Sequence, residues 1–209
     1  MPLKYLIGRY IKENAFIYYF LTLILVLGIA FGAVMVNRLP SQHSEPLVDE
    51  LQFYFEVLEE RPDLERQELL WQSFNSNARF VIICWLLGLT IIGIPIVVFM
   101  VFSRGMVLGF SVAFLFEQAS LRGLVFSILA ILPQNLLVLP GILIASVASL
   151  SFSWVLIMKV VKNKNIQVLP HFRNYSVLCA VTLLIMLIAA LVEAYITPAI
   201  LRLIVPMMI

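Results

Sequence analysis

Residues 124–158 read LVFSILAILPQNLLVLPGILIASVASLSFSWVLIM, an apolar run without a single charged residue. The run is longer than the roughly 20 residues that cross a bilayer, so it indicates a membrane-embedded chain. Its middle holds a proline and two amides, Pro133, Gln134 and Asn135, where lipid-facing side chains are expected. A proline frees a backbone carbonyl, and polar neighbours can satisfy the backbone groups that are freed. We therefore interpret this triplet as a structural helix break inside the membrane.

The composition of the whole chain indicates the same class. Of its 209 residues, 62% are hydrophobic and 12% are charged, and the mean hydropathy is +1.03. A soluble domain carries about 25% charged residues. Transmembrane barrels show short alternating segments, which this sequence lacks. We predict an all-α, polytopic helical membrane bundle that forms a single integral membrane domain over residues 1–209, in contact with membrane lipid.

The basic residues predict an orientation. The first apolar run, Ala15–Val36, follows three basic residues, which places the N-terminus in the cytoplasm. A second run, residues 80–102, is expected to return and to end at a cytoplasmic turn, Ser103-Arg104-Gly105. The last run, residues 176–198, follows a basic stretch and is expected to run outward. With two crossings between them, we predict a multi-pass protein of the cell membrane with about five spans and an extracytoplasmic C-terminus.

The lengths of the two middle crossings conflict with straight helices. Residues 106–116 are too few to cross a bilayer, and residues 124–158 are too many for one straight helix. A broken or re-entrant element near residues 105–135 resolves both conflicts.

Residues 37–79 are predicted to form an extracytoplasmic helical segment between the first two membrane helices. They hold nine of the twelve acidic residues. Apolar residues recur every three to four positions between 47 and 58, which indicates an amphipathic helix, and Pro62 ends it. We predict a small helical cap that is either a solvated acidic loop or a docking surface for a partner. The candidate partner-binding residues are Leu70, Trp71, Phe74 and Asn77.

Small residues at four-residue spacing let membrane helices approach closely. Gly28 and Gly32 have this spacing in the first run, and Gly105 and Gly109 have it in the third. A longer series of small residues, 141–153, follows the predicted break. These faces predict close packing inside the bundle or against a second copy of the chain in a homo-oligomer.

The sequence offers no catalytic set. It lacks H-E-x-x-H, G-x-S-x-G and the phosphate-binding P-loop, and no metal ligands or cofactor motif converge. A basic patch for nucleic acid is also missing. Glu193 is the clearest intramembrane polar residue, and such a carboxylate is a functional candidate by default. Its depth of only about one turn favours an interfacial or structurally paired position, for example with Arg122, over a functional role. We predict that the protein is not an enzyme.

Six short stretches, in order, resemble the stage II sporulation protein M family of endospore-forming bacteria over nearly the whole chain. They are FGAVMVN (31–37), QSFNSNARF (72–80), GLTIIGIP (88–95), SRGMVLGF (103–110), LPQN (132–135) and EAYITP (193–198). The resemblance implies a non-enzymatic membrane scaffold that recruits and positions peptidoglycan-degrading enzymes during engulfment of the forespore. The implied partners are sporulation protein D, a lytic transglycosylase, and sporulation protein P, an amidase/endopeptidase.

The residues themselves leave one alternative open. Discontinuous membrane helices often build substrate sites. A small transporter or channel with its site at the broken helix, Pro133–Asn135, is therefore the rival hypothesis.

Overall fold

The computed structural model describes residues 14–36, 62–160 and 167–196, and within these ranges the regular secondary structure is helical. The amphipathic helix predicted at residues 47–58 lies outside them. The elements are α2 (Ala15–Val36), α4 (Pro62–Gly88), α5 (Gly93–Val160), α6 (Val168–Leu191) and the short π-helix η2 (Val192–Ile196). The bounds of α2 are those of the first apolar run, so that prediction is confirmed.

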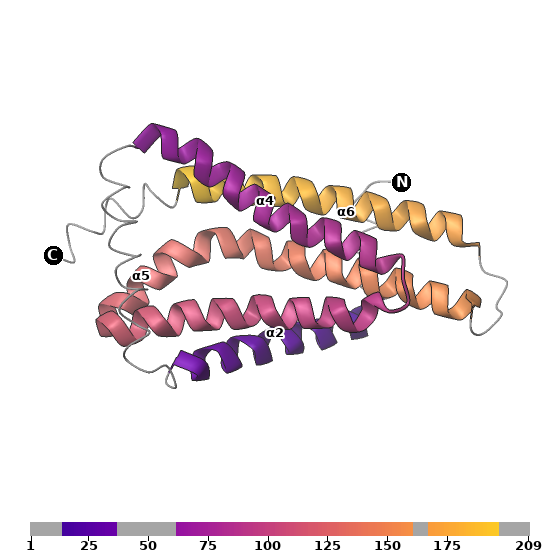
Figure 1. Cartoon of the computed structure of the whole chain (residues 1–209), viewed down its shortest axis with the longest axis horizontal. Helices are drawn as coiled ribbons and strands as arrows, with labels where there is room; N and C mark the ends of the chain where they lie inside the picture. The colour runs from indigo at the N-terminus through magenta and orange to yellow at the C-terminus, as the bar shows by residue number, and fades with distance from the viewer. Residues whose placement is uncertain (1–13, 37–61, 161–166, 197–209) are drawn as a thin grey trace.

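The chain stays helical throughout α5 and yet reverses direction within it (Figure 1). We call its two antiparallel parts the first arm, Gly93–Glu117, and the second arm, Asn135–Val160. Each arm, like α2 and α6, is long and apolar enough to cross a membrane, which gives four candidate spans among the described residues. The protein is therefore a multi-pass helical membrane protein. The reversal falls in the region where a broken or re-entrant element was expected.

Helix α4 runs along the bundle beside α5 and α6 (Figure 1). Its C-terminal half is apolar and deeply packed, since Phe80, Val81 and Cys84 are at most 5% exposed. Its N-terminal half carries charged residues and amides, which is why α4 does not qualify as a span by hydropathy. The count of five spans stays a prediction, and in this structure it requires that α4 cross the bilayer in place of the predicted span 80–102.

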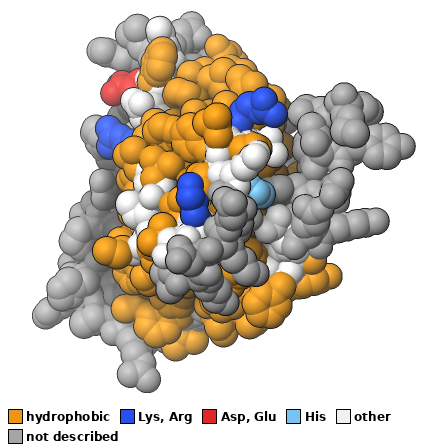
Figure 2. Space-filling model, turned by 90° about the vertical axis from the view of Figure 1, so that its right-hand side faces the viewer, with side chains coloured by type: hydrophobic (Ala, Val, Ile, Leu, Met, Phe, Trp, Pro, Cys, Tyr) orange, Lys and Arg blue, Asp and Glu red, His pale blue; other side chains and the backbone are white. Residues whose placement is uncertain are grey.

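We distinguish two ends of the bundle. The outer end is where α2 ends, α4 begins and α5 reverses; the inner end is where α4 passes to α5 and α5 to α6 (Figure 1). Seen from the inner end, hydrophobic side chains cover most of the described surface, with a few basic ones among them (Figure 2). Lys159 and Arg173 are exposed near this end. This placement of basic residues agrees with the expectation that the inner end faces the cytoplasm.

The predicted position of the first inner turn is wrong. The second apolar run was expected to span residues 80–102 and to end at Ser103-Arg104-Gly105, but α4 ends at Gly88 and α5 begins at Gly93. The turn residues between them are apolar apart from Thr90, so hydropathy does not mark the turn. As a result, Arg104 lies near the middle of the first arm. Residues 62–79 likewise continue into α4 and do not form a separate cap helix.

Hydroxyl groups satisfy the backbone of this apolar turn. The Thr90 hydroxyl donates to the carbonyl oxygen of Leu87 at 2.8 Å and accepts from the backbone N–H of Gly93 at 3.1 Å. The Ser153 hydroxyl lies 3.0 Å from the carbonyl oxygen of Gly88. The last carbonyls of a helix have no partner within it. These contacts therefore satisfy backbone groups of a turn that has almost no polar side chains of its own.

Tyr175 makes a second contact of this kind one turn earlier. Its buried hydroxyl donates to the carbonyl oxygen of Cys84 at 2.8 Å, and its ring stacks on that of Phe152 with centroids 5.0 Å apart. Ser149, from the second arm, donates to the same Cys84 carbonyl at 2.9 Å. Three helices, α4, α5 and α6, are thus tied together by polar groups at one level of the bundle.

The predicted close packing of small residues is confirmed. A side chain on Gly32 would overlap the backbone carbonyl of Met106, and one on Gly109 would overlap that of Ile29. Helix α2 therefore lies backbone to backbone against the first arm. In the second arm, Ala145 and Ser149 are at most 1% exposed. The second arm is the central helix, with 61% of its apolar window buried against 22–33% for the other candidate spans.

Candidate functional site: a polar cavity in the bundle

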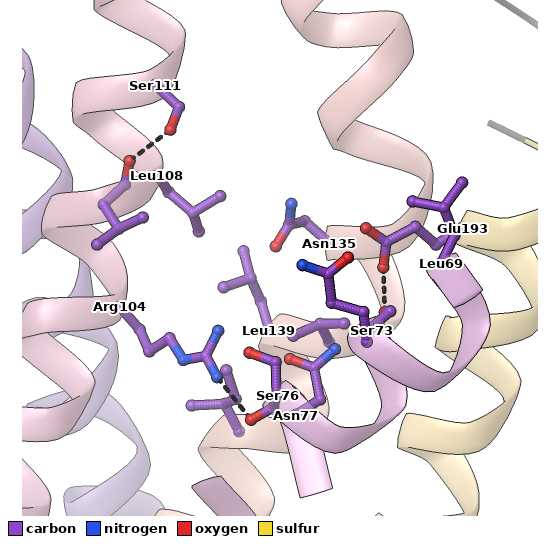
Figure 3. Close-up of a pocket in the computed structure, with 14 residues that line it drawn as sticks. Leu69, Ser73, Ser76, Asn77, Arg104, Leu108, Ser111, Asn135, Leu139 and Glu193 are labelled. Carbon is purple, nitrogen blue, oxygen red and sulfur yellow. Dashed lines mark hydrogen bonds between the residues drawn. The ribbon is translucent and has the colours of Figure 1, made fainter. Parts of the chain in front are cut away.

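A cavity of about 480 Å³ lies between α4, both arms of α5 and η2 (Figure 3). Of the 14 residues that line it, eight are polar, which is unusual inside a membrane bundle and makes the cavity the candidate site. The polar lining residues are Gln72, Ser73, Ser76, Asn77, Arg104, Ser111, Asn135 and Glu193. The cavity extends from the middle of the bundle toward the outer end.

Arg104 is the cation of this cavity. Its Nη2 donates to the carbonyl oxygen of Ser76 at 3.2 Å, and its guanidinium carbon lies 5.3 Å from the centroid of the Phe80 ring. Both contacts come from α4. No carboxylate among the described residues makes an ion pair with Arg104, although a guanidinium offers five N–H donors. Arg104 is therefore a charge at membrane depth whose hydrogen-bonding capacity is largely unused.

Glu193 lines the other side of the cavity (Figure 3). It belongs to η2, and the hydroxyl of Ser73 on α4 donates a hydrogen bond to its Oε2. Ser73 is itself buried, at 8% exposure. A π-helical turn shifts the register of side chains and often occurs at functional sites. Here it brings the carboxylate of Glu193 against α4, which supports the prediction of a structurally paired acid.

Asn77 is the most deeply buried polar residue of the α4 lining, at 6% exposure. Its amide can donate twice and accept through its oxygen. It makes no hydrogen bond with any residue in the described part of the chain, although Figure 3 places it beside Ser76 and Arg104. Because an unsatisfied buried amide is costly, this side chain requires a partner within the cavity.

The residues predicted at the helix break are distributed as follows. Asn135 lines the cavity, and Pro133 lies half-buried within α5. The Gln134 side chain lies outside the described part of the structure. The break therefore contributes one amide to the cavity, and the structural role predicted for all three residues stays a prediction.

The other predicted contact residues lie on α4, from its outer half to its middle. Trp71 is 56% exposed and meets Phe74 edge-on, with ring centroids 6.4 Å apart. Leu70 and Phe74 are half-buried. Asn77, the fourth candidate, faces the cavity. Leu70, Trp71 and Phe74 thus offer a surface that a partner can reach, and their partner role stays a prediction.

Sequence reasoning missed the two residues that define the site best. Arg104 was interpreted as the mark of a cytoplasmic turn, and Ser73 was not singled out. The available signal was the apolar stretch on both sides of Arg104, which has the composition of a membrane helix. The pairing of Ser73 with Glu193 joins residues 120 positions apart, and no local pattern predicts such a contact.

The described residues contain no group of three or more His, Cys, Asp or Glu close enough to hold a metal ion. The cavity instead combines one guanidinium, one carboxylate, amides and hydroxyls with six apolar side chains. Such a lining can bind a polar or charged group by hydrogen bonds.

The chain matches the family model described as stage II sporulation protein M over residues 21–198. No curated protein and no solved structure matches it significantly. The family match covers most of the chain, including every helix that encloses the cavity. The protein therefore belongs to the stage II sporulation protein M family and is a sporulation-related membrane protein.

Proposed function

We propose that this protein is a non-enzymatic membrane scaffold that recruits and positions peptidoglycan-degrading enzymes during engulfment in endospore formation. Family membership supports the process, and the proposed partners are sporulation proteins D and P. The observation that carries the proposal is the aromatic pair of exposed Trp71 and half-buried Phe74 in the outer half of α4.

An aromatic pair at this place suits protein recognition. Tryptophan is enriched among residues that dominate binding energy, because its large ring buries much apolar area. The side chain of Trp71 is 56% exposed, so most of that area is available to a partner. The expected orientation puts the outer end on the extracytoplasmic side, where peptidoglycan lies. A tryptophan at the membrane interface can also serve as a lipid anchor, so the experiment must distinguish the two roles.

The test replaces Leu70, Trp71 and Phe74 together by alanine in the full-length protein and measures which wall hydrolase co-purifies from sporulating cells. We expect co-purification to fall at least about tenfold, since central aromatic contacts are each worth 2 kcal/mol or more. Membrane insertion should persist, because the three side chains lie outside the apolar, deeply packed C-terminal half of α4. Trp154→Ala is the matched control, since Trp154 is 50% exposed on a different helix.

Two outcomes would count against the scaffold. Unchanged hydrolase recovery from the triple variant would remove its main support. Equal loss from the triple variant and from Trp154→Ala would indicate a general defect of the membrane protein and no docking surface at Trp71.

The polar cavity keeps a transporter as the second candidate. Asn135, predicted as part of a substrate site, does line the cavity. However, the cavity lining ends at Ile142, and the next turns of the second arm are tightly packed, with Ala145 and Ser146 fully buried. In the described bundle the cavity therefore does not continue to the inner end. Phosphate flux into proteoliposomes that disappears in Gln134→Leu and Asn135→Leu would favour transport over the scaffold.

A further inference from the structure

We propose that the cavity binds an amphiphilic anion, whose phosphate or carboxylate pairs with Arg104 and whose apolar part lies against the leucines and valines of the lining. The proposal is independent of the scaffold function, since it concerns the cavity between α4 and α5 and not the surface around Trp71.

Arg104 carries a positive charge that no carboxylate of the described residues neutralises. An arginine near the middle of a membrane helix is costly unless a partner compensates its charge. A backbone carbonyl and an aromatic ring supply part of that compensation. The described residues provide no carboxylate for it. The planar guanidinium binds phosphate or carboxylate through two parallel hydrogen bonds, so an anionic ligand supplies what the protein does not.

Asn77 also lies in the cavity wall and is available to a ligand. Its buried amide has no hydrogen-bond partner in the described part of the chain, and it lies beside Arg104 on the cavity wall (Figure 3). Because Asn77 and Arg104 line the same cavity, a ligand with several oxygen atoms can pair with Arg104 and also accept from the Asn77 amide. One ligand group thus satisfies both the unused guanidinium donors and the unsatisfied amide.

The cavity is large, and part of its lining is apolar. Its volume of about 480 Å³ is in the range of small-molecule sites and far exceeds that of a lone phosphate. Six lining residues are apolar: Leu69, Val107, Leu108, Val138, Leu139 and Ile142. An anionic headgroup attached to hydrocarbon therefore fits this lining better than a small hydrophilic ion. Basic pockets between membrane helices are known to hold lipid headgroups.

Glu193 does not oppose this assignment. Its carboxylate lies on the far side of the cavity from Arg104, next to the Ser73 hydroxyl (Figure 3). The anion is therefore placed on the Arg104 side, between the first arm and α4. Ser111 is already bonded to the Val107 carbonyl of its own helix, at 2.9 Å, and is not assigned to the ligand.

The experiment uses the full-length protein purified in a neutral detergent. Retention of dioleoyl phosphatidylglycerol and of dioleoyl phosphatidylcholine is compared by native mass spectrometry. We expect the wild type to retain the anionic lipid at least about tenfold better, as charge-assisted hydrogen bonds predict. Arg104→Gln and Asn77→Leu should each reduce this preference. Arg79→Gln, at an exposed arginine of the same helix as Asn77, should preserve it.

A second set of measurements distinguishes a lipid ligand from a small anion. Inorganic phosphate is added as a competitor, and Leu108→Trp fills the apolar part of the cavity without changing its charge. For a lipid, phosphate should compete poorly and Leu108→Trp should abolish retention. If phosphate displaces the lipid fully and Leu108→Trp has no effect, the site takes a small anion and the amphiphilic assignment is wrong.

The proposal fails if the wild type shows no preference for phosphatidylglycerol, a result that needs no variant. It also fails if Arg104→Gln retains the preference as Arg79→Gln does. Arg104→Lys controls for misfolding of Arg104→Gln, because it keeps the positive charge at position 104. We expect Arg104→Lys to keep a reduced preference, and a complete loss with intact folding would equally contradict pairing by charge.

Discussion

At the scale of single residues, the described bundle is organised by a few polar side chains placed where hydropathy leads one to expect only apolar ones. Tyr175, Ser149 and Ser153 satisfy carbonyl groups near the end of α4, and Ser73 holds Glu193 against the same helix. Because lipid cannot replace these hydrogen bonds, each one fixes the relative position of two helices.

Tyr175→Phe tests this structural role. The variant keeps the ring that stacks on Phe152 and removes only the hydroxyl that donates to the Cys84 carbonyl. We expect the free energy of unfolding in detergent to fall by about 1 kcal/mol, the usual net value of one such bond. Tyr195→Phe, at a 55% exposed tyrosine, is the control and should change little. Equal effects of the two substitutions would contradict the role of the Tyr175 hydroxyl.

The sequence predicts individual polar residues better than it predicts their roles. Asn135 and Glu193 stand out in apolar runs, and both line the cavity. Arg104 was misinterpreted because a basic residue followed by glycine, next to an apolar run, is typical of a cytoplasmic loop. Its true environment depends on Ser76 and Phe80, which belong to a different helix.

At the scale of helices, α2 depends on its contact with the first arm of α5. The glycines of both helices remove side chains from this contact, so the two backbones approach closely. Spacing alone was sufficient to predict these faces. It did not predict that they meet each other in parallel, with Gly28 near Phe102 and Gly32 near Met106.

Gly32→Leu should separate these helices. The new side chain would overlap the Met106 carbonyl, and overpacking of this kind lowers the free energy of unfolding by roughly 1–3 kcal/mol. Ala30→Leu is the matched control on the same helix, since Ala30 is exposed. We expect the control to lie within about 0.5 kcal/mol of the wild type. A tolerated Gly32→Leu in an unfolding titration would contradict the close approach.

The helices themselves were predicted with unequal success, for physical reasons. The bounds of α2 follow from an apolar run with basic residues before it. The turn at residues 89–92 was missed because its backbone is satisfied by Thr90 and Ser153, so the turn needs no polar stretch. The polar first half of α4 suggested a separate cap, whereas in the structure that half helps to enclose the cavity.

At the scale of the whole molecule, the bundle combines a largely hydrophobic exterior (Figure 2), a polar cavity between α4 and α5 (Figure 3) and the pair of exposed Trp71 and half-buried Phe74 in the outer half of α4. The proposed ligand site and the proposed partner-binding surface therefore lie at different places in the molecule. The cavity, with Arg104 and Asn77, is suited to a small amphiphile. The surface around Trp71 is suited to a protein, and the scaffold hypothesis depends on it.

The most direct test of the scaffold is photo-crosslinking in sporulating cells. A photoreactive amino acid replaces Trp71 in the full-length protein, and a second strain carries it at Trp154. We expect an adduct with a peptidoglycan hydrolase from position 71 and none from position 154. Absence of a hydrolase adduct at position 71, or the same adduct from both positions, would contradict it.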